Sequence, residues 1–521
     1  MTAEPRVVLL RTEISAPAPG GSLLGHPKGV FLVAATEFWE RFSYWGMMGL
    51  LVLYLAAPTI ENGFGWERAE ALRLYGLYAG LVFATPAVGG WLSSRYLGER
   101  RCILVGGITV ALGHFLLGGP AYWSALIERV SDVPVHALLH ESGVTLGRLF
   151  PSGEVWQQLA NQLERAGYPP AGVATKLPWL QAAYLLVGWS FMIGLACIVM
   201  GTGFIKPTIS SIIGKFYAPG DVRREAGFTI FMVGIWSGGL VANFIAGTLG
   251  EKLGWQYGFT AAGFGMTLGV VLYLWKQQPY LGEIGRRPDR DHVRQQPPVP
   301  TVTFTMAERE RLWVVGVMGM FTILYATAFY QKGGLIHLMV KDSVDRTVWG
   351  FEVPATWFLT ISTAGFVVLA PVASWLWRWL GQRGRALDAV EKQAIGLLAM
   401  ATSYVFLLVA AVEHERAGAV SMGWIVTAYL GFSVGEVCIW PPQITAASKL
   451  APERIASFVI GSWYVTVGSG TFLAGWVGAS AYTFSTTGVF AALLAACATG
   501  AGLLLLLRRR LVRMMHGVSP I

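Results

Sequence analysis

The residues from Thr36 to Gly46 read TEFWERFSYWG, and they lie inside an apolar run that extends from about residue 29 to residue 57. The run is long enough to cross a bilayer as a helix. Glu37, Glu40 and Arg41 are spaced i, i+3 and i+4, so a helix places all three on one face. Each charge at the bilayer centre costs about 2.5–3.5 kcal/mol on insertion scales, which predicts a face turned toward protein or a water-filled cavity.

Two interpretations of this charged face compete. A structural ion pair could lock two helices together, but one Glu and one Arg would suffice for that purpose. The second carboxylate leaves one acid without a matching base, and such an acid can take up a proton. Ionisable groups inside membranes usually mark ion or substrate paths, which favours proton handling by Glu37, Glu40 and Arg41.

The composition indicates a polytopic membrane protein. Of the 521 residues, 54% are hydrophobic and 13% are charged, whereas soluble domains carry about 25% charged residues. Mean hydropathy is +0.52. The four cysteines lie in apolar stretches at no metal-like spacing, so they predict packing residues, no disulfide framework and no metal site. No nucleophile elbow or cofactor loop is present, which argues against an enzyme.

Twelve apolar windows have the length of a membrane-spanning helix. They cover residues 29–57, 70–97, 101–119, 179–216, 224–249, 256–276, 308–340, 354–380, 388–412, 421–448, 455–483 and 485–507. Most Lys and Arg residues fall on one side of these windows, which places both termini in the cytoplasm and predicts a multi-pass protein of the cell (inner) membrane.

The remaining segments define the expected domain organisation. We expect a disordered cytoplasmic lead, an N-terminal six-helix bundle, a flexible basic linker, a C-terminal six-helix bundle and a basic cytoplasmic tail. Residues 120–178 form an extracytoplasmic insertion between the third and fourth helices, with short helical pieces such as 155–166. The five regions are residues 1–28, 29–276, 277–307, 308–507 and 508–521.

The two predicted bundles carry similar features at matching places. Residues 36–41 of the first helix align with residues 327–332 of the seventh. The fourth helix contains Pro207, and the tenth contains Pro441 and Pro442. Proline removes a backbone donor, and broken helices at matching places point to a binding site. We therefore expect broken helices and gating hinges at these three prolines.

Six charges lie clearly inside the membrane, away from the window ends, on the first, fourth, seventh and tenth helices. They are Glu37, Glu40, Arg41, Lys206, Lys332 and Glu436. Three acids and three bases can offset one another only if they pair. A set that exchanges partners as the halves move would couple protonation to transport. His114 and His337, near window ends, are expected at the membrane interface.

The chain resembles the proton-dependent oligopeptide transporter (POT/PTR) family of the major facilitator superfamily, as a divergent member. The resemblance covers nearly the whole chain. It rests first on the motif Glu37-x-x-Glu40-Arg41 and on Gly201-x-Gly203-x-x-Lys206-Pro207. Further matching motifs are Pro86-x-x-Gly89-Gly90-Trp91-Leu92, Arg95-Tyr96-Leu97-Gly98, Gly254-Trp255, Gly258-Phe259, Gly435-Glu436, Lys449-Leu450-Ala451-Pro452 and Ser462-Trp463.

This resemblance implies an all-α fold of twelve transmembrane helices in two six-helix bundles related by pseudo-twofold symmetry. It implies proton coupling through Glu37, Glu40, Arg41, Lys206 and Glu436, with a salt-bridge gate between Lys206 and Glu436. The implied substrate-binding residues are Arg41, Tyr44, Lys206, Trp236, Tyr330, Gln331, Lys332, Glu436, Trp440 and Trp463.

Several positions depart from the family pattern. Tyr330 stands where the family has an acid that is linked to proton transfer and to binding of the peptide amine. Met48, Phe83, Ser94, Trp236 and Trp440 replace polar or charged family residues. The added Trp236, Trp440 and Lys332 predict a bulkier, more aromatic and more cationic pocket, which suits an anionic ligand with an apolar body.

The expected function is proton-coupled symport of di- and tripeptides or modified peptides by alternating access. The alternative is a proton-coupled transporter of a non-peptide organic anion, favoured by the lost acid at Tyr330. A receptor without turnover is disfavoured, because a pure binder has little reason to bury the charges of helices 1, 4 and 10. We expect no cofactor, a monomer, and partners limited to substrate, protons and lipid, with no nucleic acid.

Overall fold

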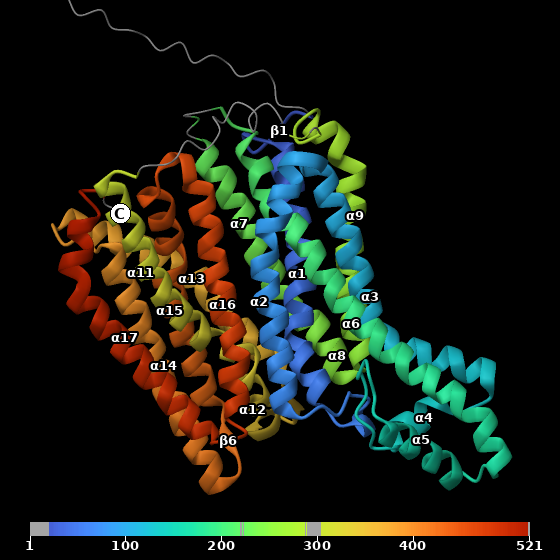
Figure 1. Cartoon of the computed structure of the whole chain (residues 1–521). Helices are drawn as coiled ribbons and strands as arrows, with labels where there is room; N and C mark the ends of the chain where they lie inside the picture. Colours follow the sequence, from blue (N-terminus) through green and yellow to red (C-terminus); the bar gives the residue numbers. More distant parts are fainter. Residues whose placement is uncertain (1–19, 219–220, 222, 287, 289–303, 519–521) are drawn as a thin grey trace, which may run out of the picture.

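The computed structural model describes residues 20–218, 221, 223–286, 288 and 304–518. Two groups of long helices stand side by side, with an additional helical segment at one lower corner (Figure 1). The N-terminal bundle consists of α1 (Lys28–Ala56), α2 (Arg68–Leu92), α3 (Glu99–Ser131), α6 (Pro170–Gly214), α7 (Arg223–Ala242) and α9 (Trp255–Leu281). The C-terminal bundle consists of α11 (Met306–Phe329), α13 (Ala355–Gln382), α14 (Ala389–Ala417), α15 (Met422–Leu450), α16 (Ala456–Ser480) and α17 (Thr486–Met514).

Short elements complete these bundles. A π-helical turn, η2 (Ser93–Leu97), prolongs α2, and α7 continues through η3 (Asn243–Gly247) and α8 (Thr248–Lys252). After α11 the chain passes through a 3-10 turn, η4 (Tyr330–Gly333), into α12 (Leu335–Ser343). The other short elements are β1 (Ser22–Leu23), β2 (His26–Pro27), η1 (Thr59–Glu61), α4 (Val135–Glu141), α5 (Gly153–Arg165), β3 (Val344–Asp345), β4 (Thr347–Val348), β5 (Phe351–Glu352), β6 (Val420–Ser421) and η5 (Glu453–Ile455).

The twelve predicted windows match this helix order. Within the described residues, ten helical stretches are long and apolar enough to span a membrane. The helices α1 and α16, with 29 and 25 residues, occupy the two remaining windows. The all-α membrane fold expected from the sequence is therefore confirmed.

Several expected boundaries were wrong. Helix α3 runs to Ser131 instead of residue 119, and α6 begins at Pro170 instead of residue 179, so much of the 120–178 insertion prolongs two spans. Residues 20–27, expected to be disordered, contain the β1–β2 hairpin. Helix α17 continues into the predicted tail as far as Met514. Residues 1–19 of the predicted lead and 289–303 of the predicted linker lie outside the described residues.

Glycines let the two bundles approach closely where α2 crosses α16. A Cβ atom on Gly475 would lie 2.4 Å from the carbonyl oxygen of Leu72 and 2.7 Å from the Cα of Gly76. One helical turn or more away, Gly80 and Gly468 meet in the same manner, with Cβ-to-carbonyl separations near 3 Å. Small residues at such crossings allow backbone-to-backbone packing inside membranes.

Replacing Gly475 with Leu should therefore force α2 and α16 apart. Overpacking of this kind typically costs about 1–3 kcal/mol, and we expect a lower melting temperature together with loss of transport. Gly461→Leu on the same helix is the matched control, because nothing lies within 4 Å of a Cβ atom at Gly461. Equal stability and uptake of the two variants would contradict the importance of this crossing.

Candidate functional site

The charged face of α1 forms a compact ion cluster. Arg41 Nε lies 3.1 Å from Glu37 Oε1, and Arg41 Nη2 pairs with the Glu40 carboxylate. All three residues are buried. Helix α7 packs directly on this part of α1, since a Cβ atom on Gly238 would lie 3.1 Å from the Cβ of Arg41. The helical spacing thus does bring both carboxylates to one guanidinium, as the sequence predicts.

Lys206 on α6 faces the same cluster. It interacts electrostatically with Glu37, Glu40 and Arg41. Its Nζ lies 4.5 Å from the ring centroid of Phe83 and 5.4 Å from that of Tyr44. Such cation–π contacts stabilise an ammonium group in an apolar setting. Two bases and two acids from α1 and α6 are therefore gathered beside aromatic rings.

A second charged group lies in the C-terminal bundle. Lys332 is buried, donates a hydrogen bond of 2.8 Å to Ser362 Oγ, and places its Nζ 3.7 Å from the Phe329 ring centroid. It interacts electrostatically with Glu436 on α15. Among the described residues no ion pair joins Lys206 to Glu436, so the gate that the resemblance implies is not formed in this conformation.

The helix break lies at a place that the sequence analysis missed. Helices α6 and α15 run without interruption through Pro207, Pro441 and Pro442, so the expectation of broken helices there was wrong. The seventh window breaks instead at η4, which holds Tyr330 and Lys332. The consecutive Gly333 and Gly334 were the available signal, because glycine tolerates backbone that helices exclude.

Aromatic side chains connect the two charged groups. Tyr330, buried on η4, meets Phe83 of α2 edge-on at 5.7 Å between ring centroids. Trp440 and Trp463 meet edge-on at 4.8 Å. Trp236 on α7 stacks on Phe366 of α13 at 4.1 Å, which joins the two bundles.

The predicted substrate residues come from both bundles. Among these residues, Gln331 has its side chain engaged by the backbone, because its amide nitrogen donates hydrogen bonds to the carbonyl oxygens of Thr327 and Ala474. Several buried polar atoms near the two charged groups have no hydrogen-bond partner within the described part of the chain. They are Glu37 Oε2, Tyr44 OH, Thr202 Oγ1, Glu436 Oε2 and Trp463 Nε1. Since buried polar groups are normally paired, these atoms identify a candidate ligand site.

Comparison with known proteins identifies the family. The model of the POT family matches residues 100–285 and 294–492. The chain belongs to the POT family. It is 28% identical to the peptide transporter YePEPT of Yersinia enterocolitica, with 89% of this chain and 90% of that protein covered. A di-/tripeptide transporter of Lactococcus lactis is 25% identical, with 85% and 87% covered.

Solved structures agree with this assignment. A POT crystal structure in complex with alafosfalin has a TM-score of 0.76 at 25% identity and covers 96% of this chain and 98% of that chain. A POT family transporter in complex with a thioalcohol-conjugated peptide has a TM-score of 0.75 at 21% identity, with 95% and 98% covered, and supports the fold alone. The chain is thus a transporter and not an enzyme, and it is a multi-pass membrane protein.

In this POT family chain, several hydrogen bonds and ion pairs join the bundles at the end that carries η1 and α12. Glu251 of α8 caps the first turn of α13 in the other bundle. Its carboxylate accepts hydrogen bonds from the backbone nitrogens of Ala355 (3.0 Å) and Thr356 (2.8 Å) and from Thr356 Oγ1 (2.7 Å). A carboxylate at a helix N-terminus satisfies unpaired N–H groups and the helix dipole.

Neighbouring contacts between the bundles also hold this end of the molecule closed. Lys252 lies 3.1 Å from Glu352, and its hydrogen bond holds the pKa of the Glu352 carboxyl below its usual range. His337 Nε2 lies 2.8 Å from the carbonyl oxygen of Gly49. Both His114 and His337 are fully buried inside the protein, and their expected place at the membrane interface stays a prediction. Glu251 was missed because its partners lie about a hundred positions away in the sequence.

Replacing Glu251 with Ala should open this end of the bundle. Hydrogen bonds to charged groups contribute about 1.5–3 kcal/mol each, so loss of the cap should shift the closed-to-open ratio by roughly tenfold or more. Spin labels at Glu61 and Asp345, both exposed, would report a longer distance population. Lys252→Ala is the control, because an exposed ion pair contributes only about 0–1 kcal/mol. Identical distance distributions for both variants would rule out the cap as a gate.

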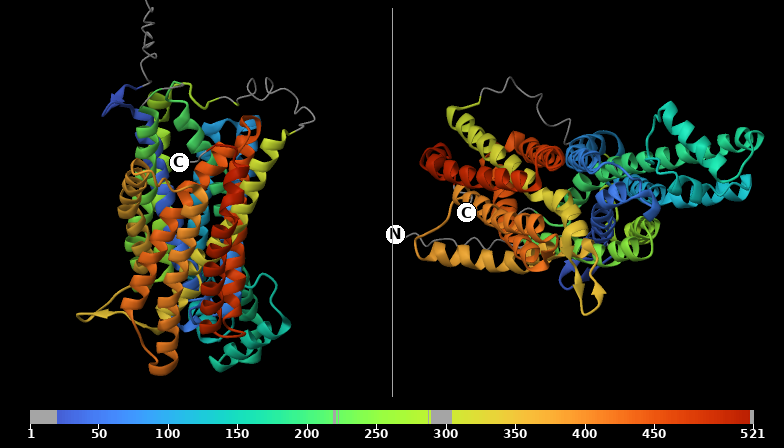
Figure 2. Two further views of the ribbon diagram at one scale, coloured as in Figure 1. Left: turned by 90° about the vertical axis from the view of Figure 1, so that its left-hand side faces the viewer. Right: turned by 90° about the horizontal axis from the view of Figure 1, so that it is seen from below.

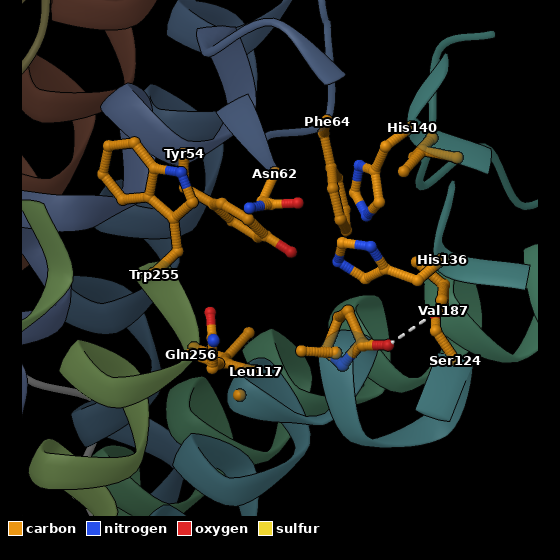
Figure 3. Close-up of a pocket in the computed structure, with 14 residues that line it drawn as sticks. Tyr54, Asn62, Phe64, Leu117, Ser124, His136, His140, Val187, Trp255 and Gln256 are labelled. Atoms are coloured by element: carbon orange, nitrogen blue, oxygen red, sulfur yellow. Dashed lines mark hydrogen bonds between the residues drawn. The ribbon is translucent and has the colours of Figure 1, made fainter. Parts of the chain in front are cut away.

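A small cavity is lined by residues of α1, α3, α4 and α9 (Figure 3). About 40 Å³ is available to water-sized molecules, between Tyr54, Asn62, His136, His140 and Gln256. His140 Nδ1 lies 2.8 Å from the carbonyl oxygen of Thr59. Burial lowers the pKa of His140 to about 4, so the ring is neutral at physiological pH and donates to that carbonyl. The cavity suits a few water molecules, not a peptide.

Proposed function

We propose that this chain is a proton-coupled symporter of di- and tripeptides or modified peptides. The observation that carries the proposal is the buried cluster of Glu37, Glu40, Arg41 and Lys206 in a chain of the POT family. A carboxylate that changes its charge beside Arg41 and Lys206 alters what these cations can hold. The peptide transporters of Yersinia and Lactococcus among its relatives favour peptides over the alternative of a non-peptide organic anion.

The proposed roles follow the two charged groups. Glu37, Glu40, Arg41, Lys206 and Glu436 would couple protons, and the cations would bind the substrate carboxylate. Tyr44, Trp236, Tyr330, Trp440 and Trp463 would hold the apolar body of the substrate, with Gln331 and Lys332 beside them. Pro207, Pro441 and Pro442 would serve as hinges inside continuous helices.

The proposal also covers the cellular location, the domain division, the oligomeric state and the absence of a cofactor. The excess of Lys and Arg on one side of the spans supports placement in the inner membrane with both termini cytoplasmic. We also propose the domain division at residues 29–276, 277–307 and 308–507, which the order of the two groups of helices supports. We propose a monomer that needs no cofactor and is driven by the proton gradient.

A direct test reconstitutes the whole chain in liposomes and imposes an inward proton gradient. Uphill uptake of labelled di- or tripeptides that ceases when a protonophore is added would support the proposal. A thermal-shift screen should run in parallel, since a ligand at 100 times its Kd stabilises the native state by about 2.7 kcal/mol. Stabilisation by organic anions and by no peptide would overturn the peptide assignment.

Restoring an acid at Tyr330 should strengthen binding of ordinary dipeptides. Tyr330 lies on η4 in electrostatic reach of Glu436 and Arg41, where a carboxylate could accept the peptide ammonium. A charge-assisted hydrogen bond is strong enough for roughly tenfold tighter binding. Calorimetry on Tyr330→Glu tests this, with Tyr330→Gln as the uncharged control. Equal affinity of the two variants would place the amine site elsewhere.

A further inference from the structure

The helical extension formed by residues 120–178 projects sideways from the N-terminal bundle (Figures 1 and 2). It contains the end of α3, α4, α5 and the beginning of α6. Helix α3 has 33 residues and is therefore about 50 Å long, well beyond a hydrocarbon core of about 30 Å. Pro120 lies inside α3 and Pro178 lies inside α6, near its beginning, and proline is a common cause of helix bends.

One side of the extension is apolar and uncovered. Leu126 and Val130 are 52% and 64% exposed, and Tyr122, one turn earlier, is 49% exposed. Leu126 and Val130 follow Ile108 and Leu112 by 18 residues, which is five helical turns. Ile108 and Leu112 are exposed on the spanning part of α3 and must face lipid. The surface of the extension thus continues the lipid-facing surface without a change of helix face.

Aromatic residues from α6 and from the loop between α4 and α5 lie near the same boundary. Trp179 and Trp189 of α6 are each 41% exposed. Phe150, which is 86% exposed, meets Trp189 edge-on at 6.0 Å between ring centroids. Aromatic side chains are enriched at membrane–water interfaces. Arg129 is the charged residue of the exposed α3 stripe, and its long side chain can reach lipid headgroups.

The opposite side of the extension is polar. Leu159 and Leu163 of α5 are fully buried, and Trp156 packs edge-on against Tyr184. The exposed residues of α5 include Glu154, Gln157, Asn161, Glu164 and Arg165. The end of α3 lies along the upper side of the extension, at the level of the spanning helices, and α4 and α5 lie below it (Figure 1). The apolar side is therefore turned toward the membrane and the polar side toward water.

Hydrogen bonds fix the orientation of the extension. Trp66 Nε1 donates to the carbonyl oxygen of Leu146 (2.7 Å), and the Leu146 nitrogen donates to that of Phe64 (2.9 Å). Lys176 Nζ of α6 donates to the Ser131 carbonyl at the end of α3. The extension is thus attached to the loop between α1 and α2 and cannot turn its apolar side away from the bilayer.

We propose that Tyr122, Leu126 and Val130, together with Phe150 and Trp179, lie in the headgroup–acyl boundary of the leaflet on the extension side. The occupant of this surface is the lipid bilayer, because the surface is continuous with the lipid-facing spans. Burial of apolar side chains in that boundary, assisted by Arg129, is how interfacial helices bind membranes. The proposal does not depend on which substrate is carried.

Site-directed spin labelling of the whole chain in liposomes tests the proposal. Labels at Leu126 and Val130 are compared with matched labels at Gln157 and Asn161 on α5, in a variant whose four cysteines are replaced by Ser. We expect labels at Leu126 and Val130 to collide more with oxygen than with a water-soluble nickel chelate, and labels on α5 to show the reverse. Equal chelate access on both sides would overturn the proposal, and so would dipolar broadening at Val130, which would indicate a second copy.

A second measurement uses the unmodified chain, so its result does not depend on whether a labelled variant folds. Phospholipids that carry a photoactivated carbene in the upper acyl chain should label peptides containing residues 122–130. Peptides from α5, residues 153–165, should remain unlabelled in the same sample. Labelling of spanning helices without labelling of residues 122–130 would overturn the proposal, whatever the transport assays show.

Discussion

Glu40→Gln should abolish uphill, proton-driven uptake while sparing exchange of substrate across the membrane. Glu40 pairs with Arg41 and interacts with Lys206 in a buried setting. Gln keeps the size of the side chain and can never carry the charge that changes in a proton cycle. Substrate binding and helix movement can continue, so counterflow should remain, whereas accumulation under an imposed gradient should fall to the level of empty liposomes.

Two further variants show whether the loss of proton-driven uptake is specific to Glu40. Glu37→Gln changes the other carboxylate of the same guanidinium, and its comparison with Glu40→Gln assigns the coupling to one acid or to the pair. Glu283→Gln, at an exposed acid near the end of α9, should leave uptake unchanged. Undiminished accumulation by Glu40→Gln at normal protein levels would remove this carboxylate from the coupling path.

Lys332→Met should destabilise the protein strongly, and Glu436→Gln should restore much of the loss. Removing one partner of a buried charge pair typically costs about 3–5 kcal/mol, because the other charge stays buried and unpaired. Lys332 and Glu436 are 4% and 6% exposed. The double variant removes both charges, so it should melt at a higher temperature than Lys332→Met alone.

The double-mutant cycle isolates this pair from general effects of losing a buried lysine. Lys392→Met is the matched control, because Lys392 is also buried, at 5% exposure, and packs against Trp377. Its effect should add to that of Glu436→Gln within about 0.5 kcal/mol. If Lys332→Met lowers substrate affinity and leaves the melting temperature unchanged, Lys332 is a binding residue and not a structural partner.

Local patterns were sufficient to predict the spans and the α1 cluster. The spacing of Glu37, Glu40 and Arg41 fixes their common helix face, and Lys206 follows from its place in an apolar window. The electrostatic interaction of Lys332 with Glu436 was not predictable, because it depends on how η4 meets α15. The contacts of Glu251 and His337 across the bundles were not predicted for the same reason: their partners belong to the other bundle and are set by the packing of two halves.

The prolines show a second reason why helix breaks could not be predicted from the sequence. Pro207, Pro441 and Pro442 were expected to break helices, but neighbouring helices in a membrane can satisfy the freed backbone groups. The break at η4 carries no proline, and its glycine pair is inconspicuous in a chain with 64 glycines. A helix break is therefore a property of the packed bundle as much as of the residue.

The glycines at the α2–α16 crossing limit the kinds of motion that remain open to the two halves. With Gly76 and Gly475 nearly in backbone contact, sliding along the helix axes would drive neighbouring side chains such as Phe472 into the opposite backbone. Rotation of the two bundles about the crossing avoids these collisions, so the crossing acts as a pivot point. Atoms farthest from that point then travel the longest arcs, so the strongest displacement falls at the ends of the helices, while the crossing itself stays nearly still.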